Sequence, residues 1–211
     1  MKTMFRIFAG GRALGLAVAI AAAASLGATA ARAEGAAYRL DPEHSTIGFL
    51  VDHIGFARVM GKFTDVSGEF TFDEKAPALS GLRVVVRTES VWTGHGERDK
   101  HLRGKDFLDV GNFPDMVFVG RRAEATGPRT GRIEGDLTLL GRTRPLTLEV
   151  TWNKSGRYPF GGGLLGEPNY VTGISARGSI RRSEFGMTYA VENGWVGDRI
   201  DLILEVEAIR Q

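Results

Sequence analysis

The feature that most constrains this fold is an alternation of apolar and polar residues that recurs along the chain. It is clearest near the C-terminus, where apolar residues occupy every second position: Ile200, Leu202, Leu204, Val206 and Ala208. Successive side chains of a β-strand point to opposite faces, so a period of two predicts a strand with one buried face and one wet face. The acidic Asp201, Glu205 and Glu207 fall on the wet face.

The same alternation predicts strands in most of the chain. The segments that show it are 45–53, 63–73, 82–91, the stretch around Met116 and Phe118, 131–140, 145–152, 171–181 and 200–208. We read Gly55–Gly61 as a turn-prone link, Gly141–Arg144 as a hairpin turn, and the Gly- and Pro-rich Arg157–Asn169 as a long loop. About eight evenly spaced strands favour a sandwich or an up-and-down barrel, and eight is the size at which a barrel can hold a small ligand.

A polar insert, Thr93–Phe118, interrupts this pattern and contains two of the four histidines. Its segment Glu97–Arg103 has the composition of a short helix, with Asp99 and Arg103 four residues apart and Gly104 as a stop signal. We expect the insert to close one end of the barrel.

The N-terminus predicts a secretory signal peptide over residues 1–33. Lys2, Arg6 and Arg12 precede an apolar run, Leu14–Leu26, and Ala31-Arg32-Ala33 matches a cleavage site. The run is about 13 residues long, whereas a bilayer span needs about 20. We therefore predict an exported chain with one domain, residues 34–211, no transmembrane segment in the mature chain and a periplasmic location.

Composition narrows the function classes further. Removing residues 1–33 takes away four of the 27 basic residues and leaves 23 against 25 acidic ones, so the mature chain is slightly acidic. A nucleic-acid partner thereby loses its electrostatic support. The chain has no cysteine, which excludes disulfides, thiolate metal sites and cysteine nucleophiles.

Motifs for catalysis or metal binding are not recognisable. His44, His53, His95 and His101 match no ligand spacing such as H-E-x-x-H, so no metal site is predicted. Ser45 follows His44 but lies in no nucleophile elbow, and Gly161-Gly162-Gly163 lacks the Lys-Ser/Thr of a phosphate-binding loop. Nothing in the sequence supports an enzyme. The inward apolar residues fit either an ordinary core or the wall of an apolar lumen.

Several motifs together resemble the YceI-like family. They are Leu40-Asp41-Pro42-Glu43-His44-Ser45, Gly61-Lys62-Phe63, Arg98-Asp99-Lys100-His101-Leu102-Arg103, Gly135-Asp136-Leu137-Thr138-Leu139-Leu140-Gly141 and Arg182-Ser183-Glu184-Phe185-Gly186. They occur in the family's order, and the resemblance covers roughly Tyr38–Ile209.

The resemblance implies an all-β fold, an extended eight-stranded antiparallel lipocalin-like barrel with a short helical insert. It also implies a periplasmic homodimer, without covalent cofactor, whose lumen binds a small apolar lipid: a long polyisoprenoid or isoprenoid quinone. A prenyl tail offers few hydrogen-bonding groups, so its affinity comes from buried apolar area at about 25 cal/mol per Å².

On this basis we assign candidate site residues. The expected contacts of the lipid tail are Phe49, Val51, Phe70, Phe72, Met116, Phe118 and Trp152. The expected residues of the polar mouth are His53, Asp99 and His101, whereas His95 is expected at the surface. Two alternatives stay open: an enzyme that modifies a lipid or quinone with His53 and His101 as acid-base groups, and a purely structural or partner-binding barrel.

Overall fold

A computed structural model describes residues 35–160 and 166–211 of the chain. The proposed signal peptide and Gly161-Gly162-Gly163 lie outside the described residues. The strands are β1 (Ala36–Leu40), β2 (Thr46–His53), β3 (Ala57–Phe63), β4 (Val66–Asp73), β5 (Ala78–Arg87), β6 (Val91–Trp92), β7 (Asp115–Ala125), β8 (Thr130–Leu139), β9 (Arg142–Arg157), β10 (Tyr170–Arg181) and β11 (Val196–Arg210). The helices are α1 (Gly96–Arg103) and two 3₁₀ turns, Thr88–Ser90 and Arg182–Phe185.

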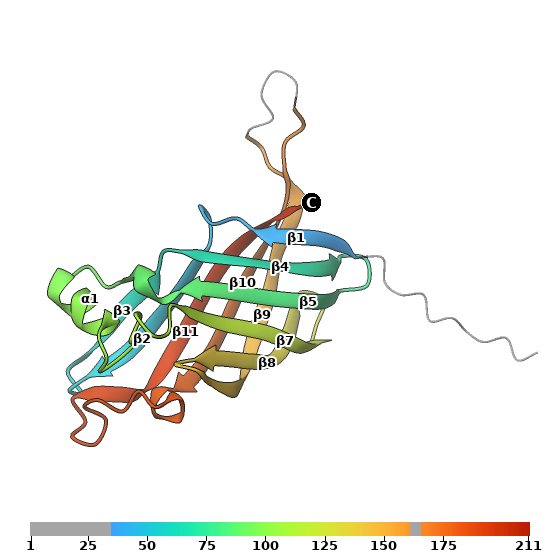
Figure 1. Cartoon of the computed structure of the whole chain (residues 1–211). Helices are drawn as coiled ribbons and strands as arrows, with labels where there is room; N and C mark the ends of the chain where they lie inside the picture. Colours follow the sequence, from blue (N-terminus) through green and yellow to red (C-terminus); the bar gives the residue numbers. More distant parts are fainter. Residues whose placement is uncertain (1–34, 161–165) are drawn as a thin grey trace, which may run out of the picture. The chain divides into compact units, whose positions relative to one another are not determined.

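Eight of the described strands form a closed antiparallel barrel in the order β1-β4-β5-β7-β8-β9-β10-β11, and β11 returns to β1. β2 and β3 extend the sheet beyond β11, and the two-residue β6 adds to β3. Figure 1 shows the barrel with α1 at one end. The predicted all-β, eight-stranded barrel with a short helix is confirmed.

β11 closes the barrel because it has two partners along one edge. Val196–Glu205 pairs with β2, and Ala208–Arg210 pairs with β1. Its other edge pairs with β10 along most of its length. The turn 41–45 joins β1 to β2 beside the point where β11 changes partner.

The interpretation of Gly55–Gly61 as a link was wrong, because strand β3 begins at Ala57. Its inward positions are Val59, Gly61 and Phe63, and a glycine in that row hides the alternation. Phe49 explains the glycine: a Cβ at Gly61 would lie 2.2 Å from Phe49 Cζ, so the ring occupies that space. Its outward Met60 is 65% exposed and further obscures the pattern.

Two other boundaries also differ from the prediction. The strand expected at 82–91 runs over Ala78–Arg87 and ends in a 3₁₀ turn, where buried Thr88 donates its hydroxyl to the Phe113 carbonyl at 2.7 Å. The hairpin turn is tighter than expected, with Leu140 and Gly141 between β8 and β9, both at positive φ. Two residues of this conformation match the twist of the flanking strands.

Gly135 allows β8 to approach β7 closely. A Cβ there would lie 2.4 Å from the Val119 carbonyl oxygen and 2.5 Å from Phe118 Cζ. We expect Gly135→Ala to lower the free energy of unfolding by about 1–3 kcal/mol, since backbone and ring must both shift. Urea unfolding measures the change. Gly96→Ala, whose Cβ would meet nothing within 4 Å, is the control and should not destabilise; equal loss in both variants would contradict the packing argument.

Candidate functional site: an apolar cavity inside the barrel

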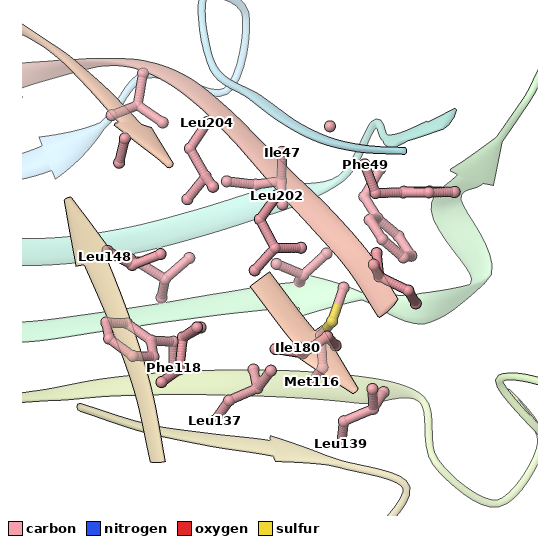
Figure 2. A pocket seen from close by; sticks show the side chains of 18 of the residues that line it. Ile47, Phe49, Met116, Phe118, Leu137, Leu139, Leu148, Ile180, Leu202 and Leu204 are labelled. Atoms are coloured by element: carbon pink, nitrogen blue, oxygen red, sulfur yellow. The ribbon is translucent and has the colours of Figure 1, made fainter. Parts of the chain in front are cut away.

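The barrel encloses a cavity with a volume of about 190 Å³. Among residues 35–160 and 166–211, every one that lines it has an apolar side chain, apart from Gly48 and Arg182. Figure 2 shows part of this wall, with Ile47, Phe49, Met116, Phe118 and Leu202 directed into it. The volume lies below the ~300–1,000 Å³ of ordinary ligand pockets.

The wall follows from the alternation of the strands. β11 contributes Ile200, Leu202, Leu204 and Val206, and β10 contributes Ile174, Ala176 and Ile180. All of them except Ala176 are only partly buried, although they point inward. Inward side chains that keep accessible surface mean that the interior is not fully packed.

Among the described residues of the wall, Arg182 is the one that carries a charge, and backbone carbonyls stabilise its cation. Its Nε donates to the Gly197 carbonyl at 2.8 Å, Nη1 to Met187 at 2.9 Å and Nη2 to Val196 at 2.7 Å. The side chain is 1% exposed and its guanidinium lies 5.8 Å from the Phe107 ring centre. Burial lowers the pKa of Arg182 from its usual value, because low polarity disfavours the cation.

The turn that holds Arg182 is fixed by Asp198 and Gly186. Asp198 Oδ1 accepts the Ser183 backbone N–H at 2.9 Å, and Oδ2 lies 3.4 Å from Arg181 Nη1. Burial on its own raises the pKa of Asp198, but these hydrogen bonds outweigh burial and lower it. Gly186 has a φ of 87°, a left-handed conformation that glycine adopts without steric penalty.

The insert Thr93–Phe118 closes one end of the barrel, as predicted. Leu102, Phe107 and Leu108 of this lid line the cavity. Figure 1 shows α1 at that end, and the helix packs against β6. The lid is held by Arg103, whose Nε donates to the Glu89 carbonyl at 2.7 Å and whose Nη2 donates to Val91 at 2.9 Å.

Five of the seven expected tail residues line the cavity: Phe49, Val51, Phe70, Met116 and Phe118. Phe72 and Trp152 line a neighbouring cavity of about 80 Å³, which shares Leu79, Ile133, Val150 and Ile174 with the main wall. Their rings meet edge to face, with centroids 5.4 Å apart. Contact with a lipid tail stays a prediction for all seven.

The three expected mouth residues do not form one group. Asp99 is 5% exposed, and its Oδ1 accepts the Thr93 N–H at 2.8 Å and the Thr93 hydroxyl at 2.5 Å. His101 is exposed, 3.0 Å from Asp106, and its ring packs edge-on against Phe107 and Tyr189. His53 is exposed at the end of β2. None of the three lines the cavity, and a contact with a head group stays a prediction.

Other residues have roles that the sequence did not show. Asp99 and Arg103 fit a helical pair by spacing, yet they do not bind each other. Asp99 accepts the backbone N–H of Thr93, just after β6, and Arg103 donates to the carbonyls of Glu89, before β6, and Val91, its first residue. His95 is exposed as expected, and its Nδ1 also caps α1 by accepting the Arg98 N–H. The role of Arg182 was missed; its only signal was a basic residue inside the Arg-Ser-Glu-Phe-Gly motif.

Fold and cavity together define a lipocalin-like class: a closed antiparallel barrel built around an apolar interior. The YceI-like domain model matches residues 38–208, and the chain belongs to that family. A UPF0312 protein of Yersinia enterocolitica is 40% identical over 184 residues, which cover 86% of this chain and 91% of the relative.

Solved structures share the fold. A YceI protein of Campylobacter jejuni has a TM-score of 0.65 at 28% identity, covering 76% of this chain and 90% of that one. A polyisoprenoid binding domain from Saccharophagus degradans has a TM-score of 0.58 at 14% identity, covering 83% and 99%. In residues 35–160 and 166–211, no helix has both the length and the apolar character of a membrane span.

The buried carboxylate of Asp99 gives a test of the lid. Asp99→Ala leaves the Thr93 N–H and hydroxyl without this acceptor, which costs about 1–3 kcal/mol locally. We expect hydrogen exchange in residues 93–112 to rise about tenfold to hundredfold, while exchange in β7–β10 stays the same. Glu97→Ala, an exposed position on the same helix, is the control. Unchanged exchange in the lid of the Asp99 variant would contradict this anchoring role.

Proposed function

We propose that this protein is a periplasmic binding or carrier protein that holds a long polyisoprenoid, or an isoprenoid-quinone-like amphiphile, in its barrel. The observation that carries the proposal is the cavity wall, which in the described residues is apolar except for one cation already bound by three backbone carbonyls. Such a wall offers a ligand almost no directional hydrogen bond. Its affinity therefore comes from burying apolar surface, which a prenyl chain supplies along its whole length.

The shape of the cavity supports a flexible chain. The lining reaches from Leu102 and Phe107 of the lid to Ile133 and Val150, which also border the neighbouring cavity. Met116 and Leu202 also line the cavity, and a flexible side chain such as Met adapts readily to the shape of a bound chain. A head group stays outside this wall. Of the three proposed mouth residues, His101 is the one whose aromatic neighbour, Phe107, lines the cavity.

The name of the Saccharophagus degradans domain, which describes polyisoprenoid binding, supports the same ligand class. The enzyme alternative finds no comparable support, because His53 and His101 lie outside the cavity wall and have no defined position relative to a bound chain. We also propose the periplasm, from the N-terminal signal pattern.

A homodimer is part of the proposal. Large apolar side chains are exposed on and near β3: Ile54, Phe56, Met60, Trp92 and Trp195. Phe56 is 89% exposed, and the backbone N–H of Ile54 donates to the Trp195 carbonyl at 3.1 Å, which joins two of these segments. A second copy of the chain would remove this surface from water.

Native mass spectrometry with lipid extraction tests the proposed function on freshly purified protein. We expect a prenyl species to leave with the protein, and the mass of the intact assembly reports the dimer. Leu202→Trp fills the cavity and should lower ligand occupancy at least about tenfold, since each excluded methylene loses about 0.8 kcal/mol.

Ile203→Trp is the matched control, because it introduces the same tryptophan at the next position of β11, and Ile203 does not line the cavity. It should retain the ligand. Repeated preparations of the wild type without any prenyl species, or equal occupancy in both tryptophan variants, would argue against a lipid carrier.

A further inference from the structure

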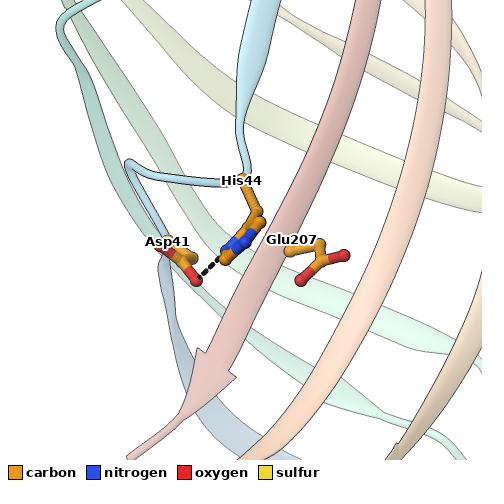
Figure 3. A group of neighbouring side chains, drawn as sticks. All are labelled: Asp41, His44 and Glu207. Carbon is orange, nitrogen blue, oxygen red and sulfur yellow. Dashed lines mark hydrogen bonds and ion pairs between the residues drawn. The ribbon is translucent and has the colours of Figure 1, made fainter. Parts of the chain in front are cut away.

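A second group of polar side chains lies away from the cavity wall, at the closure of the barrel. Asp41 and His44 come from the turn between β1 and β2, and Glu207 comes from β11. One nitrogen or oxygen atom from each residue lies within 4.8 Å of the other two. His44 Nδ1 is 2.8 Å from Asp41 Oδ2, and Figure 3 shows both side chains and Glu207 converging on one space.

The backbone fixes the geometry of this group. The Glu207 carbonyl accepts the Asp41 N–H at 2.9 Å and the Ser45 hydroxyl at 3.2 Å. Asp41 Oδ1 accepts the Glu43 N–H at 2.9 Å, which leaves Oδ2 directed at His44. This is the point where β11 changes partner from β2, at Glu205, to β1, at Ala208. The three side chains are therefore held by the barrel framework.

Glu207 carries the observation that points to a ligand. Its Oε2 is shielded from solvent and has no hydrogen-bond partner in the described part of the chain. A buried, unpaired carboxylate oxygen is unfavourable, and such atoms in native proteins commonly mark a bound water or ion. His44 and Glu207 also line a surface cavity of about 350 Å³ together with Lys154 and Tyr158, so a small ligand has a route to them.

We propose that Asp41, His44 and Glu207 bind a divalent first-row transition cation of the Zn²⁺ type. One imidazole and two carboxylates suit such cations better than they suit Mg²⁺ or Ca²⁺, which bind oxygen ligands. Metal–ligand bonds of about 2.0–2.2 Å require small side-chain rotations from the present separations. Three protein ligands leave a coordination position for water or another oxygen donor, which would reach the cation from the surface cavity that His44 and Glu207 line.

The test is thermal unfolding of chelator-treated protein with and without ZnCl₂. At a free Zn²⁺ concentration about a hundredfold above Kd, the melting temperature should rise by about 5–10 °C, because the cation binds only the folded chain. His44→Ala and Glu207→Gln should lose this rise. Without metal, Glu207→Gln should be at least as stable as the wild type, since the shielded Oε2 has no hydrogen bond to lose.

His101→Ala is the matched control, because His101 and Asp106 form an exposed pair of the same chemistry at 3.0 Å with neither residue in the three-residue group. It should keep the full response to Zn²⁺. No response of the wild type would overturn the proposal, and so would a rise that persists in both His44→Ala and Glu207→Gln. Loss of stability of Glu207→Gln in the absence of metal would assign Glu207 to an ion pair with protonated His44 instead.

Discussion

The fold depends on the double pairing of β11. One edge of this strand bonds to β10, and the other bonds first to β2 and then to β1. Each change of partner must keep the backbone N–H and C=O groups paired, because an unpaired group away from water is costly. Closure through β1 joins β4 to β11 and turns an open sheet into a barrel. The interior then exists because every strand directs its apolar row at the same axis.

An interior closed in this way has particular chemistry. In the described part of the wall the single cation is Arg182, which donates to the carbonyls of Val196 and Gly197 at the start of β11 and of Met187 in the segment before it. Its contact with Phe107 links the start of β11 to the lid. The same residue thus stabilises the barrel end and contacts the lid side chain. Binding by apolar area is the chemistry that such a wall supports.

Much of the fold was predictable because the alternation of β11, β10 and β9 is strong, and because one wet face and one buried face leave a single register. β3 was missed for a physical reason. Its inward position 61 is a glycine, because the Phe49 ring fills the space of a side chain, and its outward position 60 is the apolar Met60. Neither residue fits an alternation of apolar inward and polar outward residues. The position of the lid at one end of the barrel was predictable, but the hydrogen bonds that hold it were not. Spacing identified Asp99 and Arg103, whereas their partners, Thr93 and the carbonyls of Glu89 and Val91, depend on tertiary structure.

The candidate site shows the same division. The alternating pattern of the strands predicted that Phe49, Val51, Phe70, Met116 and Phe118 point inward, and all five line the cavity. The pattern does not show where along the barrel axis a side chain lies. Phe72 and Trp152 line the neighbouring cavity instead. Histidines were ranked by their place in motifs. The group of Asp41, His44 and Glu207 escaped notice because 163 positions separate His44 from Glu207 and only barrel closure brings them together.

The central claim is that the barrel interior holds a chain-like lipid. The most direct test is the electron density inside the barrel of crystals grown from protein purified without delipidation. Our account predicts continuous, elongated density between Phe107 of the lid and Ile133, in van der Waals contact with Met116, Phe118 and Leu202. A collapsed interior in which these side chains fill the space, or a cavity filled with ordered water, would contradict it.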